Sequence, residues 1–179
     1  MQHLFLITDN EKKQIIMNIL YLHGLKGKLN DEKRDILENY GKVFAPDIDY
    51  DLKHVQPELI LESLKGTEIN VVIGSSMGTL NSYIISDSIG RPALLFNPPL
   101  AKYIDNNQIR AHYLKGNSFK QIVLGGVDDV VNPKETLSFL ANHIQKEELD
   151  IHIDPRLAHR IPPELFEAQT KIFFSKLCY

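Results

Sequence analysis

The stretch NVVIGSSMG, residues 70–78, decides the fold of this 179-residue chain. Its first part, Val71-Val72-Ile73, has the continuous apolar character of a strand that is buried on both faces of a parallel sheet. A helical pattern runs from Met77 to Ile89, so the glycines between the two elements fall in a sharp turn. Such a turn forces its central residue, Ser76, into a strained backbone conformation from which the hydroxyl projects.

The same alternation of short apolar segments and longer amphipathic ones continues on both sides of this stretch. Continuous apolar strands joined by helices predict a doubly wound, mostly parallel sheet with helices on both faces, as one α/β domain over residues 1–179. In an open sheet of this kind, ligands bind at the carboxyl ends of the strands. The other predicted strands are 18–22, 42–48, 93–96, 121–124 and 149–153, and the other predicted helices are 30–40, 57–65, 133–144 and 162–177.

Two segments do not follow the alternation. Residues 1–16 suit either an N-terminal β-hairpin with the first strand or a leader that precedes a start at Met17. Residues 100–118 form the longest connection without a clear element, directly after the fourth strand. Long connections at that position are often functional, so we predict a small lid here, which is too short to be a large cap domain.

Composition and charge exclude several classes of function. The 20 Lys and Arg against 23 Asp and Glu give a formal charge of −3, without the basic excess that nucleic-acid binding requires. No uncharged apolar stretch approaches the roughly 20 residues of a membrane span. Cys178 has no partner for an internal disulfide, and residues 4–7 are too short for a signal-peptide core. We therefore expect a cytoplasmic protein, as a monomer or small homo-oligomer.

Ser76 is the candidate nucleophile, with Gly74 and Gly78 on either side of it in a G-x-S-x-G pattern. A side chain at either glycine would clash with the neighbouring strand and helix. The helix that begins at Met77 presents unpaired N–H groups, which stabilise negative charge that develops beside the serine oxygen. Two alternatives are a plain strand-to-helix turn capped by serine, and a phosphate-binding loop. The second lacks the Gly-Lys-Ser/Thr run of a P-loop.

A serine hydroxyl is a weak nucleophile and needs a base that is held by a third group. Asp128 and Asp129 follow the fifth predicted strand, and His159 follows the sixth. The order Ser76, Asp128, His159 is typical of a triad whose members all lie at the carboxyl edge of one sheet. The spacing from the preceding glycine favours Asp128 over Asp129. The alternatives are a turn-forming aspartate and a surface histidine.

The first predicted strand ends at His23-Gly24-Leu25. A glycine-containing loop there directs the N–H of Leu25 to the same point as the N–H of Met77, and the two make an oxyanion hole. His23 precedes the nucleophile in the chain, so we expect it to organise the loop and not to act as the base. A plain turn is the alternative. The nearby Lys26 and Lys28 either attract an anionic substrate or are simply solvated.

Together these motifs make the chain from Met17 onward resemble the α/β-hydrolase superfamily. Three segments look more narrowly like the small bacterial YqiA-type esterases. They are the segment from Met17 to His23-Gly24, the Gly-Ser-Ser-Met-Gly elbow, and the run Phe96-Asn97-Pro98-Pro99. One departure is Leu157-Ala158, where many relatives have glycines before the histidine. The resemblance implies a compact hydrolase with a minimal cap that acts on carboxylic esters or acyl-CoA thioesters.

We therefore expect a serine hydrolase that forms an acyl-enzyme intermediate and acts on a small-molecule ester or an acyl-CoA-like substrate. No pair of histidines has the spacing of metal ligands, so we expect neither a metal nor a cofactor. Peptidases, acyltransferases and lyases share the same framework. The alternative from a different class is a non-catalytic binding protein that uses this fold as a scaffold.

Overall fold

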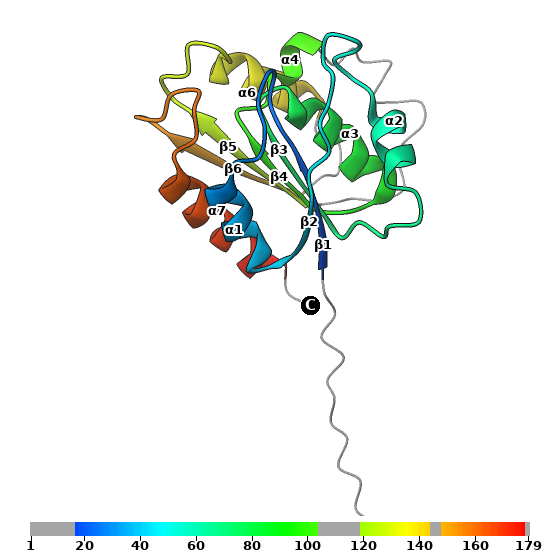
Figure 1. The fold of residues 1–179 in the computed structure, drawn as a ribbon. Coiled ribbons are helices and arrows are strands. Elements are labelled where there is room, and N and C mark those ends of the chain that lie inside the picture. The colour runs from blue at the N-terminus through cyan, green and yellow to red at the C-terminus, as the bar shows by residue number, and fades with distance from the viewer. Residues whose placement is uncertain (1–16, 104–118, 144–147, 178–179) are drawn as a thin grey trace, which may run out of the picture.

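A computed structural model of the protein describes residues 17–103, 119–143 and 148–177. Six strands form one sheet in the order β2-β1-β3-β4-β5-β6, and every neighbouring pair is parallel (Figure 1). The strands are β1 (Met17–Leu22), β2 (Gly41–Phe44), β3 (Val71–Ser75), β4 (Ala93–Phe96), β5 (Lys120–Gly125) and β6 (Leu149–Asp154). The helices are α1 (Asp31–Glu38), α2 (Pro57–Ser63), α3 (Gly78–Ile89), α4 (Leu100–Tyr103), α6 (Pro133–His143) and α7 (Pro163–Lys176).

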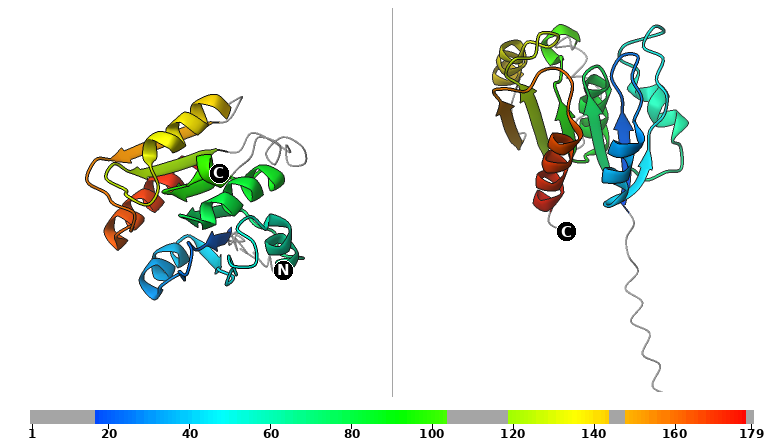
Figure 2. Two further views of the ribbon diagram at one scale, coloured as in Figure 1. Left: turned by 90° about the horizontal axis from the view of Figure 1, so that it is seen from above. Right: turned by 60° about the vertical axis from the view of Figure 1, so that its left-hand side comes forward.

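The predicted α/β fold class is confirmed, because helices cover both faces of this parallel sheet (Figure 2). Side chains alternate along each strand. In β1, Leu20 and Leu22 point to the layer of α2, α3 and α6, whereas Ile19 and Tyr21 point to the layer of α1 and α7. All four side chains are buried, which explains why these strands are apolar throughout instead of alternating in polarity.

The second strand is shorter than the sequence predicts. It ends at Phe44, whereas the apolar pattern continues to residue 48. Pro46 has no N–H to donate to a ladder. The N–H of Ile48 donates to the ring nitrogen Nε2 of His23 instead, at 2.9 Å. The chain therefore leaves the sheet early in order to cross the end of β1.

The lid segment begins with a helix that the sequence analysis did not predict. This helix, α4, packs against α6, and its first residue, Leu100, is fully buried. The rest of the predicted lid, residues 104–118, lies outside the described residues, as do residues 1–16 with the predicted hairpin or leader. None of the helices in the described ranges is long and apolar enough to cross a membrane.

The order of winding opens a crevice between the loops that follow β1 and β3. The chain passes from β1 outward to β2 and then returns across β1 to β3, so the winding direction reverses between β1 and β3. At such a reversal, the loops that follow the two strands diverge and leave a crevice. The loop at His23 and the turn at Ser76 follow these two strands, so the candidate residues lie at the reversal.

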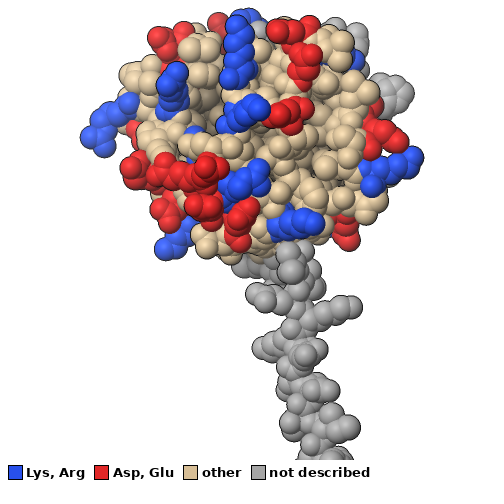
Figure 3. Space-filling model, in the orientation of Figure 1, with Lys and Arg blue, Asp and Glu red and all other residues tan. Residues whose placement is uncertain are grey.

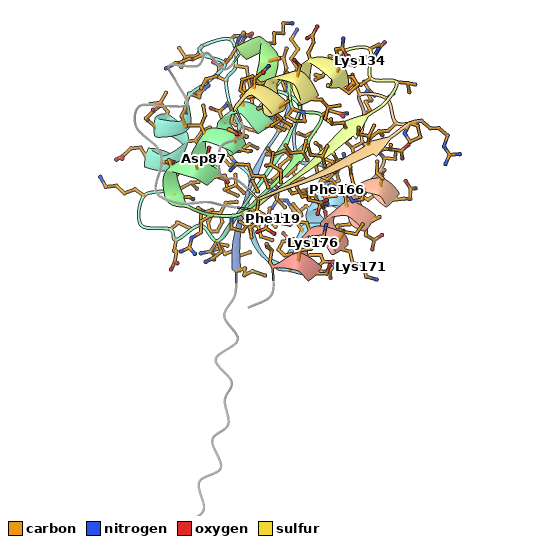
Figure 4. All side chains as sticks on the ribbon, turned by 180° about the vertical axis from the view of Figure 1, so that it is seen from behind. Asp87, Phe119, Lys134, Phe166, Lys171 and Lys176 are labelled. Atoms are coloured by element: carbon orange, nitrogen blue, oxygen red, sulfur yellow. The ribbon has the colours of Figure 1, made fainter. Side chains whose placement is uncertain are left out.

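A charged pair is buried at the opposite edge of the sheet. Lys120 begins β5 with its side chain fully buried, and its Nζ lies 2.5 Å from Oδ1 of Asp87 on α3 (Figure 4). The same Nζ lies 5.0 Å from the centroid of the Tyr83 ring. A carboxylate and an ammonium group out of contact with water must neutralise each other. The pair therefore links the third helix to the fifth strand.

Replacing Lys120 by methionine is expected to destabilise the protein by about 3–5 kcal/mol, because the Asp87 carboxylate is then buried without its cation. Replacing Asp87 by leucine in the same chain removes the uncompensated charge, so the double variant is expected to regain most of the lost stability. Urea unfolding followed by circular dichroism measures both changes. A single variant as stable as the wild type would contradict this role of the pair.

Candidate functional site

The turn after β3 has the strained backbone that its sequence predicts. Ser76 has φ +50°, in the left-handed region that residues with a side chain seldom adopt. Its N–H donates to the carbonyl oxygen of Phe96 at 2.8 Å, and its own carbonyl accepts the hydroxyl of Thr79 at 2.5 Å. These two bonds hold the turn between the fourth strand and the first turn of α3. The Ser76 side chain consequently projects from the edge of the sheet.

Both glycines of the pattern are required by close packing. A Cβ at Gly78 would lie 2.2 Å from the carbonyl oxygen of Leu22. A Cβ at Gly74 would lie 2.4 Å from Oγ of Ser82 and 2.9 Å from Cα of Thr79. Helix α3 therefore begins directly against the end of β1 and lies directly on β3, and only glycine leaves room for both contacts.

The structure brings three of the predicted side chains together. The Ser76 hydroxyl donates to Nε2 of His159 at 2.9 Å. The Nδ1–H of His159 donates to Oδ2 of Asp128 at 2.8 Å. The three residues follow β3, β6 and β5, so residues that are 83 and 31 positions apart in sequence meet at one edge of the sheet. The predicted Ser76, Asp128 and His159 thus form one hydrogen-bonded series.

Asp128, and not Asp129, is the aspartate in contact with the histidine. Its side chain is fully buried, and its second oxygen, Oδ1, accepts the N–H groups of Val130 and Val131 at 2.8 and 2.9 Å. These two bonds fix the carboxylate and satisfy the oxygen that does not face His159. Asp129 is exposed. The carboxylate is thereby pre-oriented to hold the His159 ring in one tautomer.

The loop that carries His159 is held by an asparagine to which the sequence analysis gave no role. Asn97 is buried with φ +47° at the end of β4. Its Nδ2 donates to the carbonyl oxygens of His159 at 3.0 Å and Ala158 at 3.3 Å, and its Oδ1 accepts the N–H of Gly125 at 2.7 Å. Asn97 therefore joins the loops after β4, β5 and β6. The sequence feature that could have indicated this role is an asparagine at the end of a strand, because asparagine tolerates the left-handed conformation.

Leu157 stands at a position where many relatives have a glycine, and here it has a packing role. Its side chain is buried in the layer of α1 and α7. Its carbonyl oxygen would lie 2.5 Å from a Cβ placed on Gly125, so the histidine loop lies directly over the end of β5. The two loops can approach this closely because Gly125 has no side chain, so residue 157 does not need to be a glycine.

His23 ties the loop after β1 to the chain beyond β2. Its Nδ1–H donates to the carbonyl oxygen of Gly24 at 2.8 Å, and its Nε2 accepts the N–H of Ile48 at 2.9 Å. The Tyr50 hydroxyl donates to the carbonyl oxygen of His23 at 2.5 Å. Both ring nitrogens are thus occupied by backbone groups, as expected for a residue that organises the loop. Tyr50, a second residue to which the sequence analysis gave no role, completes this arrangement.

A cleft of about 680 Å³ opens beside Ser76. The loop residue Leu25 and the elbow residue Met77 line it, and within the described residues neither backbone N–H donates a hydrogen bond. Gly24 approaches the elbow so closely that a Cβ there would lie 3.1 Å from Cβ of Ser76. Two unused donors therefore lie in the loops on either side of the serine, where the sequence analysis predicted an oxyanion hole.

The cleft also contains a phenol that stays neutral. Burial raises the pKa of Tyr21 to about 12, although a hydrogen bond with the Ser75 side chain acts in the opposite direction. The Tyr21 hydroxyl is therefore protonated throughout the neutral range and contributes no negative charge to the cleft. Within the described ranges, no group of three or more His, Cys, Asp or Glu side chains is arranged to hold a metal ion.

Replacing Asn97 by alanine is expected to destabilise the protein by about 3 kcal/mol. The change leaves the Gly125 N–H and two carbonyl groups without their partner, and it puts alanine in a left-handed conformation. Urea unfolding measures the loss. In the control variant, Asn97→Gly, only the hydrogen bonds are lost, so we expect a smaller effect. An alanine variant with wild-type stability would show that Asn97 does not hold the three loops together.

No family model matches the sequence, and no curated protein matches it either. Solved structures do match. Alpha/beta hydrolase domain-containing protein 10 from mouse is 11% identical, with a TM-score of 0.68 over 90% of each chain. Est1E from Butyrivibrio proteoclasticus is 15% identical, with a TM-score of 0.65 over 90% of this chain and 88% of its own. Esterase PE8 is 14% identical, with a TM-score of 0.64 over 90% of this chain and 93% of its own.

These similarities concern the arrangement of the strands and helices. The narrower resemblance to the YqiA-type esterases stays a prediction from the sequence. The chain has the α/β-hydrolase fold that its motifs imply.

Proposed function

We propose that the protein is a serine hydrolase that cleaves carboxylic esters or acyl thioesters, with Ser76 as nucleophile, His159 as general base and Asp128 as the carboxylate that orients the base. The observation that carries this proposal is the series of hydrogen bonds from Ser76 Oγ through the His159 ring to Asp128. A serine hydroxyl in line with an imidazole and a buried carboxylate is the arrangement that activates a nucleophile.

In the first step, Nε2 of His159 takes the proton of Ser76 as Oγ attacks the acyl carbonyl carbon. The imidazolium that forms is stabilised by the Asp128 carboxylate on its other side. The negative charge on the carbonyl oxygen is taken up by the N–H groups of Leu25 and Met77. Losing one donor of this type costs roughly 2.7–4 kcal/mol of transition-state stabilisation in enzymes of this kind.

In the second step, His159 returns its proton to the leaving alcohol or thiol, and the acyl group stays on Ser76. Water then attacks the acyl-enzyme while His159 accepts a proton from it; the bond between the acyl carbon and Ser76 Oγ breaks, His159 returns the proton to Oγ, and the carboxylic acid leaves. The sum is the addition of one water across the ester or thioester bond. Each step needs the same three side chains in the same geometry, so they act as a unit.

The cleft suits a small molecule. Its volume of about 680 Å³ is in the usual range of small-ligand sites, and Pro99, Val130 and Val131 give it an apolar wall. The name of one protein of similar fold, esterase PE8, is a further argument for ester hydrolysis. A cytoplasmic location, a monomer or small homo-oligomer, and the absence of a cofactor remain predictions from the sequence.

A fluorophosphonate probe is expected to label the wild-type protein covalently at Ser76, since only an activated serine reacts with it. Replacing Ser76 by alanine should abolish labelling and lower kcat for p-nitrophenyl butanoate by about four to six orders of magnitude. Ser75→Ala is the matched control and should still be labelled. If the folded wild-type protein is neither labelled nor active, the proposal is overturned and a binding protein built on this fold becomes the better explanation.

The two adjacent aspartates allow a second test. Replacing Asp128 by asparagine is expected to lower kcat by about 10⁴-fold with little change in KM, because the amide no longer selects the reactive tautomer of His159. Asp129→Asn changes the same charge one residue away at an exposed position and should be close to wild type. Steady-state hydrolysis of p-nitrophenyl butanoate measures both variants. Equal losses in the two would argue against this role for Asp128.

A further inference from the structure

The cleft beside Ser76 is lined by charges of one sign. Five basic residues line it, and among the described residues no aspartate or glutamate does. The chain as a whole carries more acidic than basic residues. On the face drawn in Figure 3, by contrast, acidic side chains gather over α1 and α7. The basic residues of the cleft are Lys26, Lys28, Lys33, Lys102 and Arg160.

Three of these charges have no ion-pair partner among the described residues. Lys28, at the rim, is paired with Asp47 at 3.3 Å, and both side chains are largely exposed. Within the described residues, no carboxylate forms an ion pair with Lys26, Lys33 or Arg160. Cations around a concave surface that lack counter-charges raise the local potential, and they attract anions into the cleft.

Lys33 is the least solvated of the three. It lies half-buried on α1, and its Nζ is 5.3 Å from the centroid of the Phe166 ring of α7, a residue marked in Figure 4. Burial lowers the pKa of Lys33, and the neighbouring Glu32 acts in the other direction with a smaller effect. An ammonium group that has lost part of its hydration gains more from an anionic partner than an exposed one does.

Arg160 supplies a different kind of donor. It directly follows His159 in the chain, and its side chain is exposed at the edge of the cleft. A guanidinium group presents two parallel N–H donors that match the two oxygens of a carboxylate or phosphate. Lys33 and Arg160 thus provide a point charge and a planar fork on the wall of the cleft that holds the proposed nucleophile.

We infer that the cleft contains an anion-binding subsite made by Lys33 and Arg160, and that the preferred substrates are esters or thioesters with a carboxylate or phosphate near the bond that is cleaved. The inference rests on the proposed hydrolysis at Ser76 and adds the substrate class. The charged group belongs either to the acyl part or to the leaving group. The subsite chemistry is the same in both cases.

Two matched pairs of esters test the inference and separate the two placements. Mono-p-nitrophenyl adipate against p-nitrophenyl hexanoate places the charge on the acyl part. 4-Butanoyloxybenzoate against 4-butanoyloxybenzamide places it on the leaving group. The readout is the ratio of kcat/KM for the anionic member to that for the neutral member, each divided by its rate of non-enzymatic hydrolysis. We expect a ratio of at least about ten in one pair, falling as salt is raised because exposed charges are screened.

Substitutions assign the subsite to its residues. Lys33→Met keeps an unbranched apolar side chain at this half-buried position, and Arg160→Gln changes an exposed side chain, so both variants should fold. Each is expected to lower the ratio at least about fivefold. Lys171→Gln removes a positive charge from the exposed side of α7, away from the cleft (Figure 4), and should leave both rates unchanged. A preference that survives both cleft substitutions would overturn the assignment.

The outcomes also separate this inference from the proposed function. If the wild-type protein is labelled at Ser76 and the ratio of anionic to neutral kcat/KM is close to one in both pairs, the anion subsite is wrong and the hydrolase proposal stands. If no ester is hydrolysed and Ser76 is not labelled in a folded protein, the hydrolase proposal fails, and the inference fails with it.

Discussion

The rest of the site depends on one close contact, between the start of α3 and the end of β1. The backbone at Gly78 comes so near the Leu22 carbonyl that no side chain fits between them. The contact fixes the position at which the helix leaves the sheet, and with it the strained conformation of Ser76. It also places the loop after β1 beside the serine, so that Leu25 and Met77 line the same cleft.

The parallel sheet then sets where the remaining groups lie. Because all six strands run in the same direction, the loops that follow them emerge at one edge. Asp128 and His159 reach Ser76 from neighbouring strands β5 and β6, and Asn97, at the end of β4, bonds to the loops of both. The side chain of Asp128 is buried and its oxygens are satisfied by N–H groups, so its position does not depend on the solvent.

Three residues of this edge, Lys26, Ser76 and Asn97, are held in a backbone conformation that residues with side chains seldom adopt. Ser76 and Asn97 both have positive φ, and their N–H groups donate to neighbouring strands at 2.8 Å. A strained conformation persists when the surrounding bonds determine it, and such conformations concentrate at functional sites. The strain here lies in the loop after β1, in the turn at Ser76 and in the residue that holds the histidine loop. The conformations of Ser76 and Asn97 are therefore held by hydrogen bonds to the neighbouring strands β4 and β5.

Much of the architecture was determined by the sequence alone, because it follows from local patterns. The apolar runs of β1 and β3, the glycines around Ser76 and the order of Ser76, Asp128 and His159 are readable within short windows of the chain. They sufficed to predict the parallel sheet and the three side chains that meet. Buried strands and sharp turns can be recognised in the sequence because each depends mainly on the residues within it.

Other features were decided only by the tertiary structure, because each depends on residues far apart in the chain. The end of β2 is set by the bond from Ile48 to His23, and the role of Asn97 by carbonyl groups about sixty residues further along. The burial of Asp128 against His159, with Asp129 exposed, follows from how the loops after β5 and β6 pack against each other. The charge of the cleft is likewise a property of several loops and helices together, and no single stretch of the sequence encodes it.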